Sequence, residues 1–341
     1  MQIPRYWAQV RLRHQTGLRH GCTVQRWGWS DESQLAADAH AKARAQEALE
    51  LLLQPPEQRQ LGRGFRRIEH AGTYGLSGET PIREEILEER GHAVKTRNSY
   101  GAHCLNTPDV AIADVDTAPA KPPLPHLFPV FSLALTLGPL LLLLLEAQAF
   151  TKQYLLSWLW IGFFALLFIR NLRRWLARPR QSAATEMERA ALERITTFSQ
   201  QHPDWGLRLY KTPKGLRVIV THRPMRFDDA DVKALFAALQ VDPLYARLCK
   251  RQQCFRARVT GKPWRMGMNG PSEQARRWPV KEKHAAERQR WNQQYDARAQ
   301  QYSACQFVSQ LGVQSITAEV QPLVTWHDDS CQAHHATLPM A

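Results

Sequence analysis

The sequence predicts an α+β domain assembled from both ends of the chain, with a two-helix transmembrane hairpin inserted between them. Three observations predict this fold class. Two closely spaced apolar segments interrupt an otherwise polar chain of 341 residues, whose mean hydropathy is −0.44. Strand-like and helix-like patterns occur on both sides of these segments. The first flank stops just after a predicted central strand, so either flank alone would expose an unfinished sheet edge.

The first flank, residues 1–117, begins with a predicted β-hairpin. Residues 5–12 and 22–29 alternate apolar and polar side chains, which is the period of a half-buried strand. The elements expected after this hairpin are a helix from Asp31 to about Leu53, a short helix from Thr80, and β-prone runs at residues 92–96, 101–106 and 110–115.

The second flank, residues 185–330, has the same mixture of elements. Thr185 and Glu188 have capping-box spacing and predict a helix start. A tight turn at residues 212–215 joins two apolar strands. The expected elements are a helix at 185–201, strands at 206–210 and 216–221, a helix at 228–239, a β-like run at 254–259, a polar helix at 282–311 and an edge strand at 318–326. Residues 331–341 are expected to form a loose tail.

Two apolar segments between the flanks, together residues 127–171, predict the membrane hairpin. Residues 127–145 contain no charged side chain. A helix of that length spans about 28 Å, close to the hydrocarbon thickness of about 30 Å. Residues 154–171 form the second predicted span, with Phe150 and Trp175 as interfacial aromatic residues. The loop between the spans is long enough only for an antiparallel turn.

Charge beside the hairpin predicts its orientation. A proline-rich tether, residues 118–126, leads into the hairpin, and a basic linker, residues 172–184, follows it. The arginines at this end are Arg170, Arg173, Arg174, Arg178 and Arg180. The positive-inside rule therefore places both flanks and both termini in the cytoplasm of a multi-pass inner-membrane protein. A buried helical hairpin inside a large globular protein is the alternative.

The whole chain is basic, with a net charge of +14 and a pI of about 9.8. This balance favours polyanionic partners, namely nucleotide, nucleic acid or anionic lipid headgroups, although flanks that only set membrane topology are also basic. The six cysteines form no CxxC pair and predict reduced side chains. The N-terminus lacks the apolar core of a signal peptide. Walker, HExxH, GxGxxG and Ser-His-Asp patterns are absent from the sequence, which argues against the enzyme classes that they mark.

A hydrophobic strand at Val110–Thr117 ends in an Asp-x-Asp pair. Because side chains alternate along a strand, Asp114 and Asp116 lie on the same face. Two such carboxylates repel each other unless a cation lies between them, and oxygen ligands suit Mg²⁺ or Mn²⁺. The pair is therefore a candidate metal site. An acidic pair at a solvated turn is the alternative.

Residues 205–222 form a predicted β-hairpin with a basic tip. Such a turn exposes backbone N–H groups and cationic side chains together, and both bind phosphate. The candidate phosphate contacts are Lys211, Lys214 and Arg217. A basic hairpin without a ligand is the alternative.

Taken together, the segments Ala113–Asp116 and Thr212–Arg217 resemble the DxD and TxxGL[HR] motifs in the catalytic core of archaeo-eukaryotic primases and ligase-associated polymerase domains. The resemblance rests on these two short motifs. It implies divalent metal at the two aspartates and phosphate contact near the basic turn. Arg217 stands where the family has a histidine. The candidates for a third carboxylate are Asp228, Asp229 and Asp328.

Basic and aromatic residues alternate again in residues 254–265, which read CFRARVTGKPWR. The candidate contacts are Arg256, Arg258, Lys262, Trp264 and Arg265. They suit a nucleic-acid backbone with a base stacked on Trp264. They suit the anionic headgroups of a membrane equally well, and the sequence leaves both alternatives open.

The end of the chain contains residues of the kinds that bind soft metals, and these are His327, Cys331, His334 and His335. A disordered tail is the alternative. The sequence thus predicts an integral inner-membrane protein with a basic cytoplasmic α+β domain. Two alternatives are a divalent-metal-dependent module for nucleotide or nucleic acid with a primase-like core, and a membrane-tethered interaction protein without catalysis. Whether the protein is an enzyme stays open.

Overall fold

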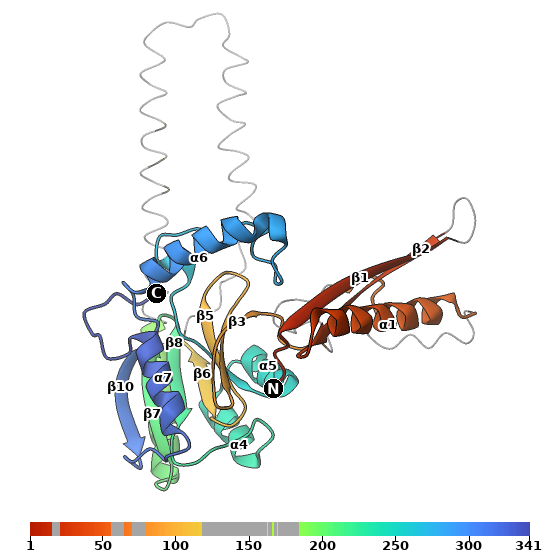
Figure 1. The fold of residues 1–341 in the computed structure, drawn as a ribbon. Helices are drawn as coiled ribbons and strands as arrows, with labels where there is room; N and C mark the ends of the chain where they lie inside the picture. Colours follow the sequence, from red (N-terminus) through yellow and green to blue (C-terminus); the bar gives the residue numbers. More distant parts are fainter. Residues whose placement is uncertain are drawn as a thin grey trace, which may run out of the picture. The chain divides into compact units, whose positions relative to one another are not determined.

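The structure is a computed structural model. It describes residues 1–15, 21–55, 65–69, 80–117 and 184–341, together with the helical residues Gly162, Leu166 and Ile169. Met1–Asp116 and Ala191–Ala341 form one compact unit, and Thr117–Ala190 form a second. The first unit carries the sheets shown in Figure 1.

One four-stranded antiparallel sheet has the order β10-β7-β8-β6. Its strands are β6 (Ile112–Asp116), β7 (Gly206–Thr212), β8 (Gly215–Val220) and β10 (Gln306–Gly312). Every residue of β8 is buried, as expected for a central strand with both faces covered. The tight turn predicted between β7 and β8 is present, and it pairs Thr212 with Gly215.

A second four-stranded antiparallel sheet has the order β3-β4-β5-β9. Its strands are β3 (Glu85–Arg90), β4 (Ala93–Arg97), β5 (His103–Thr107) and β9 (Phe255–Arg258). In both sheets a strand from the first part of the chain pairs with one from the second part, β6 with β8 and β5 with β9. Tyr245 of α5 (Pro243–Gln252) links the sheets, because its hydroxyl donates to Ile112 O at 2.8 Å and accepts from Arg256 N at 3.3 Å.

The N-terminal hairpin of β1 (Tyr6–Gln15) and β2 (Gly21–Ser30) packs against α1 (Gln34–Leu53), as Figure 1 shows. The buried face of α1 consists mainly of alanines four residues apart or nearly so, which allows a close approach. Gly28 makes that approach possible, because a Cβ at this position would lie 2.1 Å from the backbone N of Ala41.

The remaining helices cover the sheets. They are the helical residues 191–201, α4 (Ala230–Leu239), α5, α6 (Ala285–Ala299) and α7 (Gln321–Cys331), with 3-10 turns η1 (Pro263–Arg265) and η2 (Glu282–His284). Helix α7 lies against the β7–β8 sheet (Figure 1), where His327 packs edge-on against Tyr210 with ring centroids 4.7 Å apart. The main hydrophobic core combines buried residues of both four-stranded sheets with those of the helices.

Several predicted elements differ from the structure. The short helix expected from Thr80 is absent: residues 80–84 form neither helix nor strand and lead into β3. The polar helix expected at residues 282–311 ends at Ala299, and β10 follows it. The edge strand expected at residues 318–326 is largely the start of α7. The tail expected to be loose is packed, since Ala341 is buried and its backbone N donates to Ser303 O at 3.0 Å.

The predicted transmembrane hairpin is wrong. Among the described residues, no helix combines the length and the apolar composition needed to cross a bilayer. Helix α1 has 20 residues, about the required length, but charged side chains such as Asp38, Lys42 and Glu47 interrupt it. The inner-membrane location and the cytoplasmic placement of both termini depended on the hairpin and are corrected with it.

The segments on which this prediction was based lie outside the described residues, apart from the three isolated helical positions. These segments are the tether 118–126, the spans 127–145 and 154–171, and nearly all of the linker 172–184. The orienting arginines Arg170, Arg173, Arg174, Arg178 and Arg180 also lie outside the described residues.

Candidate functional site

The strand pairing brings the two primase-like motifs side by side. In the register of β6 and β8, Asp114 is opposite Arg217 and Asp116 is opposite Gly215. Arg217 forms a bidentate ion pair with Asp114. Its Nε donates to Oδ1 at 2.8 Å, and its Nη2 donates to Oδ2 at 3.2 Å. A bidentate pair of this kind occupies both carboxylate oxygens. The guanidinium that the resemblance places on a phosphate is therefore bound within the protein.

Asp116 differs from Asp114 because its side chain is exposed at the end of β6. Partial desolvation of its carboxylate, followed by the nearby Asp242 and Asp114, raises the pKa of Asp116, and Lys214 and Lys262 act in the opposite direction. Among the described residues, one group of three potential metal ligands converges, and it does not include Asp114 or Asp116. Binding of Mg²⁺ or Mn²⁺ at these aspartates stays a prediction.

The structure separates the three predicted phosphate contacts. Lys211 and Lys214 are exposed near the tip of the β7–β8 hairpin, whereas Arg217 is 4% exposed and faces the interior. Lys214 also lies close enough to Lys262 to lower the pKa of that ammonium. Lys214 at the tip of the hairpin therefore lies near the Lys262 turn, whereas Arg217 faces the interior.

Arg256 of β9 is structural. Its Nη2 donates to both carboxylate oxygens of Glu84 at 2.8 Å, and its Nη1 donates to Asn106 Oδ1 at 3.0 Å. Glu84 is 1% exposed and Arg256 is 8% exposed. A buried charge pair that is satisfied on both sides has no free donor for an external ligand. Arg256 is therefore not part of the contact surface that the sequence predicted.

Arg258, two residues further along, is half-buried. Its Nη1 donates to Thr260 O at 2.6 Å and to Ala341 O at 3.2 Å. These two bonds hold the guanidinium in place.

The turn after β9 presents the other predicted contacts. Residues Pro263–Arg265 form η1, closed by the bond from Arg265 N to Lys262 O at 2.9 Å. The Trp264 side chain is 57% exposed, and its ring centroid is 5.3 Å from that of Tyr100. The Lys262 ammonium lies 5.5 Å from the Trp264 ring centroid and 5.9 Å from that of Tyr100. We name this set the basic–aromatic cluster: Tyr100, Lys214, Arg258, Lys262, Trp264 and Arg265.

The cationic side chains of the basic–aromatic cluster lie close enough together to lower one another's pKa values. Burial, followed by the nearby Arg258, Arg265 and Lys214, lowers the pKa of Lys262 to about 8, while Asp116 acts in the opposite direction. Burial and then Arg258 also lower the pKa of Arg265. Arg265 Nη1 is buried and has no hydrogen-bond partner within the described part of the chain. Such a group is normally satisfied in a native protein.

The three candidates for a third carboxylate fall in different places. Asp228 lies 3.5 Å from Arg226, and Asp229 lies 3.8 Å from Arg223, so both form local ion pairs at the start of α4. Asp328 of α7 is 6% exposed and accepts from Tyr210 Oη at 2.6 Å and from Arg208 Nη2 at 2.7 Å. None of these three joins Asp114 and Asp116 in a metal-ligand group within the described residues.

Residues at the end of α7 form a second cluster that the sequence indicated only in part. His327 and Cys331 converge with Cys305, which lies just before β10. Spacing along the chain did not point to Cys305, because 22 residues separate it from His327. His334 joins Asp328 instead, at 3.0 Å, and His335 is exposed.

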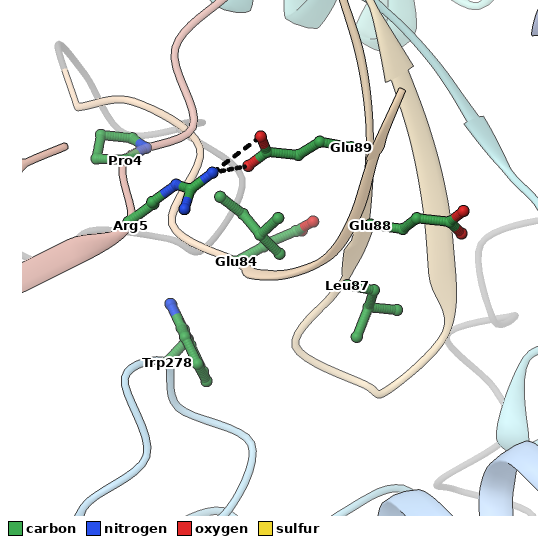
Figure 2. Close-up of a pocket in the computed structure, with 8 residues that line it drawn as sticks. Pro4, Arg5, Glu84, Leu87, Glu88, Glu89 and Trp278 are labelled. Carbon is green, nitrogen blue, oxygen red and sulfur yellow. Dashed lines mark hydrogen bonds and ion pairs between the residues drawn. The ribbon is translucent and has the colours of Figure 1, made fainter. Parts of the chain in front are cut away.

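Two surface hollows lie away from all the predicted site residues. Figure 2 shows the first, about 460 Å³, between the start of β1 and the β3 strand, where Arg5 pairs with both oxygens of Glu89 and Trp278 forms the opposite wall. The second, about 550 Å³, lies beside α7, with Trp326 and His92 among its lining residues. Their linings show no convergence of catalytic or ligand-binding groups comparable to the two clusters.

Comparison with known proteins adds no homologue. No family model, no curated protein and no solved structure matches this chain.

Proposed function

We propose that this protein binds single-stranded nucleic acid at the basic–aromatic cluster. The observation that carries the proposal is the exposed Trp264 ring with the Lys262 ammonium 5.5 Å from its centroid. A nucleotide offers a flat base and a phosphate on one short unit, and a ring beside a cation is complementary to both.

The cations of the cluster support an anionic ligand. Lys262 and Arg265 both have a lowered pKa, with contributions from cationic neighbours. This arrangement is unfavourable in the free protein, because like charges in a partly buried site repel. A phosphate group beside Lys262 and Arg265 would relieve the repulsion and give Arg265 Nη1 an acceptor. The net charge of +14 would add long-range attraction for a polyanion.

The aromatic residues support a ligand that carries bases. Trp264 packs on Tyr100 along one side and leaves more than half of its surface exposed. A stacked base contributes about 1–3 kcal/mol on such a platform. Anionic lipid headgroups would use the same cations but would not need a stacking ring, which makes them the main competing partner.

The test is fluorescence anisotropy with a labelled oligothymidine and the full chain, in buffer that contains a metal chelator. We expect Trp264→Ala to weaken binding about 5- to 150-fold, which corresponds to the loss of about 1–3 kcal/mol of stacking. Lys262→Gln is expected to weaken binding and to reduce the slope of log K against log salt by about 0.7, as one lost phosphate contact does.

Two controls make the result specific. Arg226→Gln removes one positive charge from a side chain that is 69% exposed in a local ion pair, and it should leave affinity within about twofold. An abasic strand of the same length should bind wild type about as weakly as oligothymidine binds Trp264→Ala. Equal affinity for the abasic strand, or tight binding only to vesicles of anionic lipid, would contradict the proposal.

Asp116→Asn separates this proposal from metal-dependent binding at the Asp-x-Asp pair. Asp116 is a negative charge beside the cations of the cluster. If the cations alone bind phosphate, the asparagine variant binds more tightly in the presence of chelator. If binding needs a divalent ion held by Asp116, the same variant binds less tightly and wild type needs Mg²⁺ or Mn²⁺.

A further inference from the structure

Three side chains from two separate parts of the chain meet in the interior beside the β7–β8 sheet. His327 and Cys331 are four residues apart on α7 and therefore lie on one face of the helix. Cys305 arrives from the segment before β10. Backbone hydrogen bonds join the segment around Cys305 to the end of α7. Ala304 N donates to Cys331 O at 2.9 Å, and Phe307 N donates to Ala333 O at 2.9 Å.

The three ligand atoms have the spacing of a metal site. Cys305 Sγ, His327 Nε2 and Cys331 Sγ all lie within 4.8 Å of one another. Nε2 is 3.5 Å from Cys331 Sγ and 3.9 Å from Cys305 Sγ. A tetrahedral ion with bonds of about 2.3 Å to sulfur and about 2.0 Å to nitrogen separates those ligands by about 3.5 Å. The cluster therefore needs little movement to surround one ion.

The opposite side of the imidazole is arranged as in many metal sites. His327 Nδ1 lies 3.0 Å from Asp328 Oδ1, and that carboxylate is itself held by Tyr210 and Arg208. A carboxylate on Nδ1 orients the ring and leaves the Nε2 lone pair toward the thiols. His327, Cys305 and Cys331 are each 0% exposed, so the ligands are fixed by the surrounding core.

Arg217 is the group that faces this lone pair in the free protein. Its Nη1 lies 3.2 Å from His327 Nε2, and the same Nη1 donates to Arg258 O at 3.1 Å. A metal ion has to replace only the contact with Nε2, since Asp114 and the Arg258 carbonyl still hold the guanidinium. The positive charge of Arg217 would then stabilise the two thiolates that a bound metal requires.

We propose that Cys305, His327 and Cys331 bind one thiophilic metal ion, Zn²⁺ or Cu⁺, through two thiolates and one imidazole. Thiolate and imidazole ligands select these ions over Mg²⁺ and Ca²⁺. The ion joins the end of α7 to the segment that leads into β10, and so fastens the C-terminal part of the chain to the sheet. This site is separate from the basic–aromatic cluster, and its role does not depend on nucleic-acid binding.

The experiment uses the full chain, reduced and stripped of metal, and titrates it with Co²⁺, Zn²⁺ and Cu⁺ in separate samples. We expect one equivalent of Co²⁺ to produce thiolate-to-cobalt charge-transfer absorption, and one equivalent of Zn²⁺ to abolish it. Zn²⁺ or Cu⁺ should also raise the thermal unfolding midpoint by several degrees, since a ligand that binds only the native state stabilises it. The ion that binds more tightly in competition with a chromophoric chelator identifies the preferred metal.

Matched variants locate the site. Cys331→Ser and Cys305→Ser should abolish the charge-transfer absorption, whereas Cys254→Ser, which alters another buried thiol, should retain it at one equivalent. If the cluster variants fail to fold, the wild-type titration still decides, because the metal gives a spectrum of its own. Absence of stoichiometric binding by the reduced wild type, a Cys305–Cys331 disulfide as the stable native form, or equal loss in Cys254→Ser would overturn the proposal.

Discussion

Arg217 directs its guanidinium into the protein interior, whereas Lys262 keeps its ammonium beside an exposed ring. Arg217 is 4% exposed and donates to Asp114, to a backbone carbonyl and toward His327. A buried guanidinium tolerates this position because its donors are matched by acceptors. The lowered pKa of Lys262 reflects both burial and neighbouring cations. The two residues come from similar basic patterns in the sequence but differ in role.

The lowered pKa of Lys262 predicts a pH dependence of binding. The ammonium of the free protein loses its proton as pH rises through about 8. An anionic ligand prefers the charged form, so affinity for oligothymidine should be constant below about pH 7 and fall roughly fivefold by pH 9.5, the loss of about 1 kcal/mol. Anisotropy titrations across this range measure it.

Lys262→Arg is the matched control for the pH series, because a guanidinium keeps its charge throughout. The variant should bind with little pH dependence. A decrease of the same size in Lys262→Arg would show that another group titrates, and it would remove Lys262 from the proposed contact.

At the scale of elements, the carboxylate of Asp296 helps to attach α6 to the β3–β4–β5–β9 sheet. Asp296 accepts from Arg97 Nη1 at 3.1 Å and from Arg97 Nη2 at 2.9 Å, and His103 Nε2 lies 3.1 Å from its Oδ1. Burial alone would raise the pKa of Asp296, but the bonds from His103 and Arg97 bring it down to about 2. The carboxylate therefore stabilises the folded chain in its charged form.

Asp296→Asn should lower the free energy of unfolding by about 1 kcal/mol at pH 7, a value reduced for the partial exposure of the side chain. The folded pKa is lower than the unfolded one, so this stabilisation is present above about pH 4 and is lost as pH falls toward 2. Urea unfolding at pH 7 and at pH 2.5 measures the difference, which should shrink at the lower pH. Asp228→Asn, in an exposed pair, should change stability by less than about 0.5 kcal/mol at either pH.

Local patterns predicted most strands but misassigned α7. Residues 318–326 were expected to form a last strand, confined to a sheet edge by Pro322. In the structure Pro322 lies in the first turn of α7, where a missing N–H costs nothing. The residues buried along α7 are spaced for one helix face, with Leu323, His327 and Cys331 each four apart. A short segment satisfies both periods, and packing decides between them.

At the scale of the whole molecule, the sheets depend on both parts of the chain. β8 pairs with β6, and β9 pairs with β5, so the second part alone would leave two strands without their neighbours. We expect residues 184–341, expressed alone, to lack a cooperative urea transition by circular dichroism, since an unpaired edge and an open core destabilise it. The full chain should show one. A cooperative transition in the isolated second part would contradict this dependence.

The incorrect prediction of a membrane hairpin shows that apolar composition alone does not predict a membrane-spanning helix. The prediction counted apolar residues in two runs, yet no described helix has both the length and the apolar content of a span. A transmembrane helix needs both the length and the apolar composition. Helix α1 has the length, but it contains charged side chains. Orientation and location were inferred from the hairpin, so they were corrected together with it.

The sequence by itself determined the strands β1, β2, β7 and β8 and the basic, aromatic character of residues 254–265, because these depend on side chains close together in the chain. Only the tertiary structure decided which cations are available. It pairs Arg256 with Glu84 and Arg217 with Asp114, and leaves the Lys262 ammonium beside the exposed Trp264 ring. It also brought Cys305 to His327 and Cys331. Such contacts follow from strand pairing and helix packing between distant segments, which local periodicity does not encode.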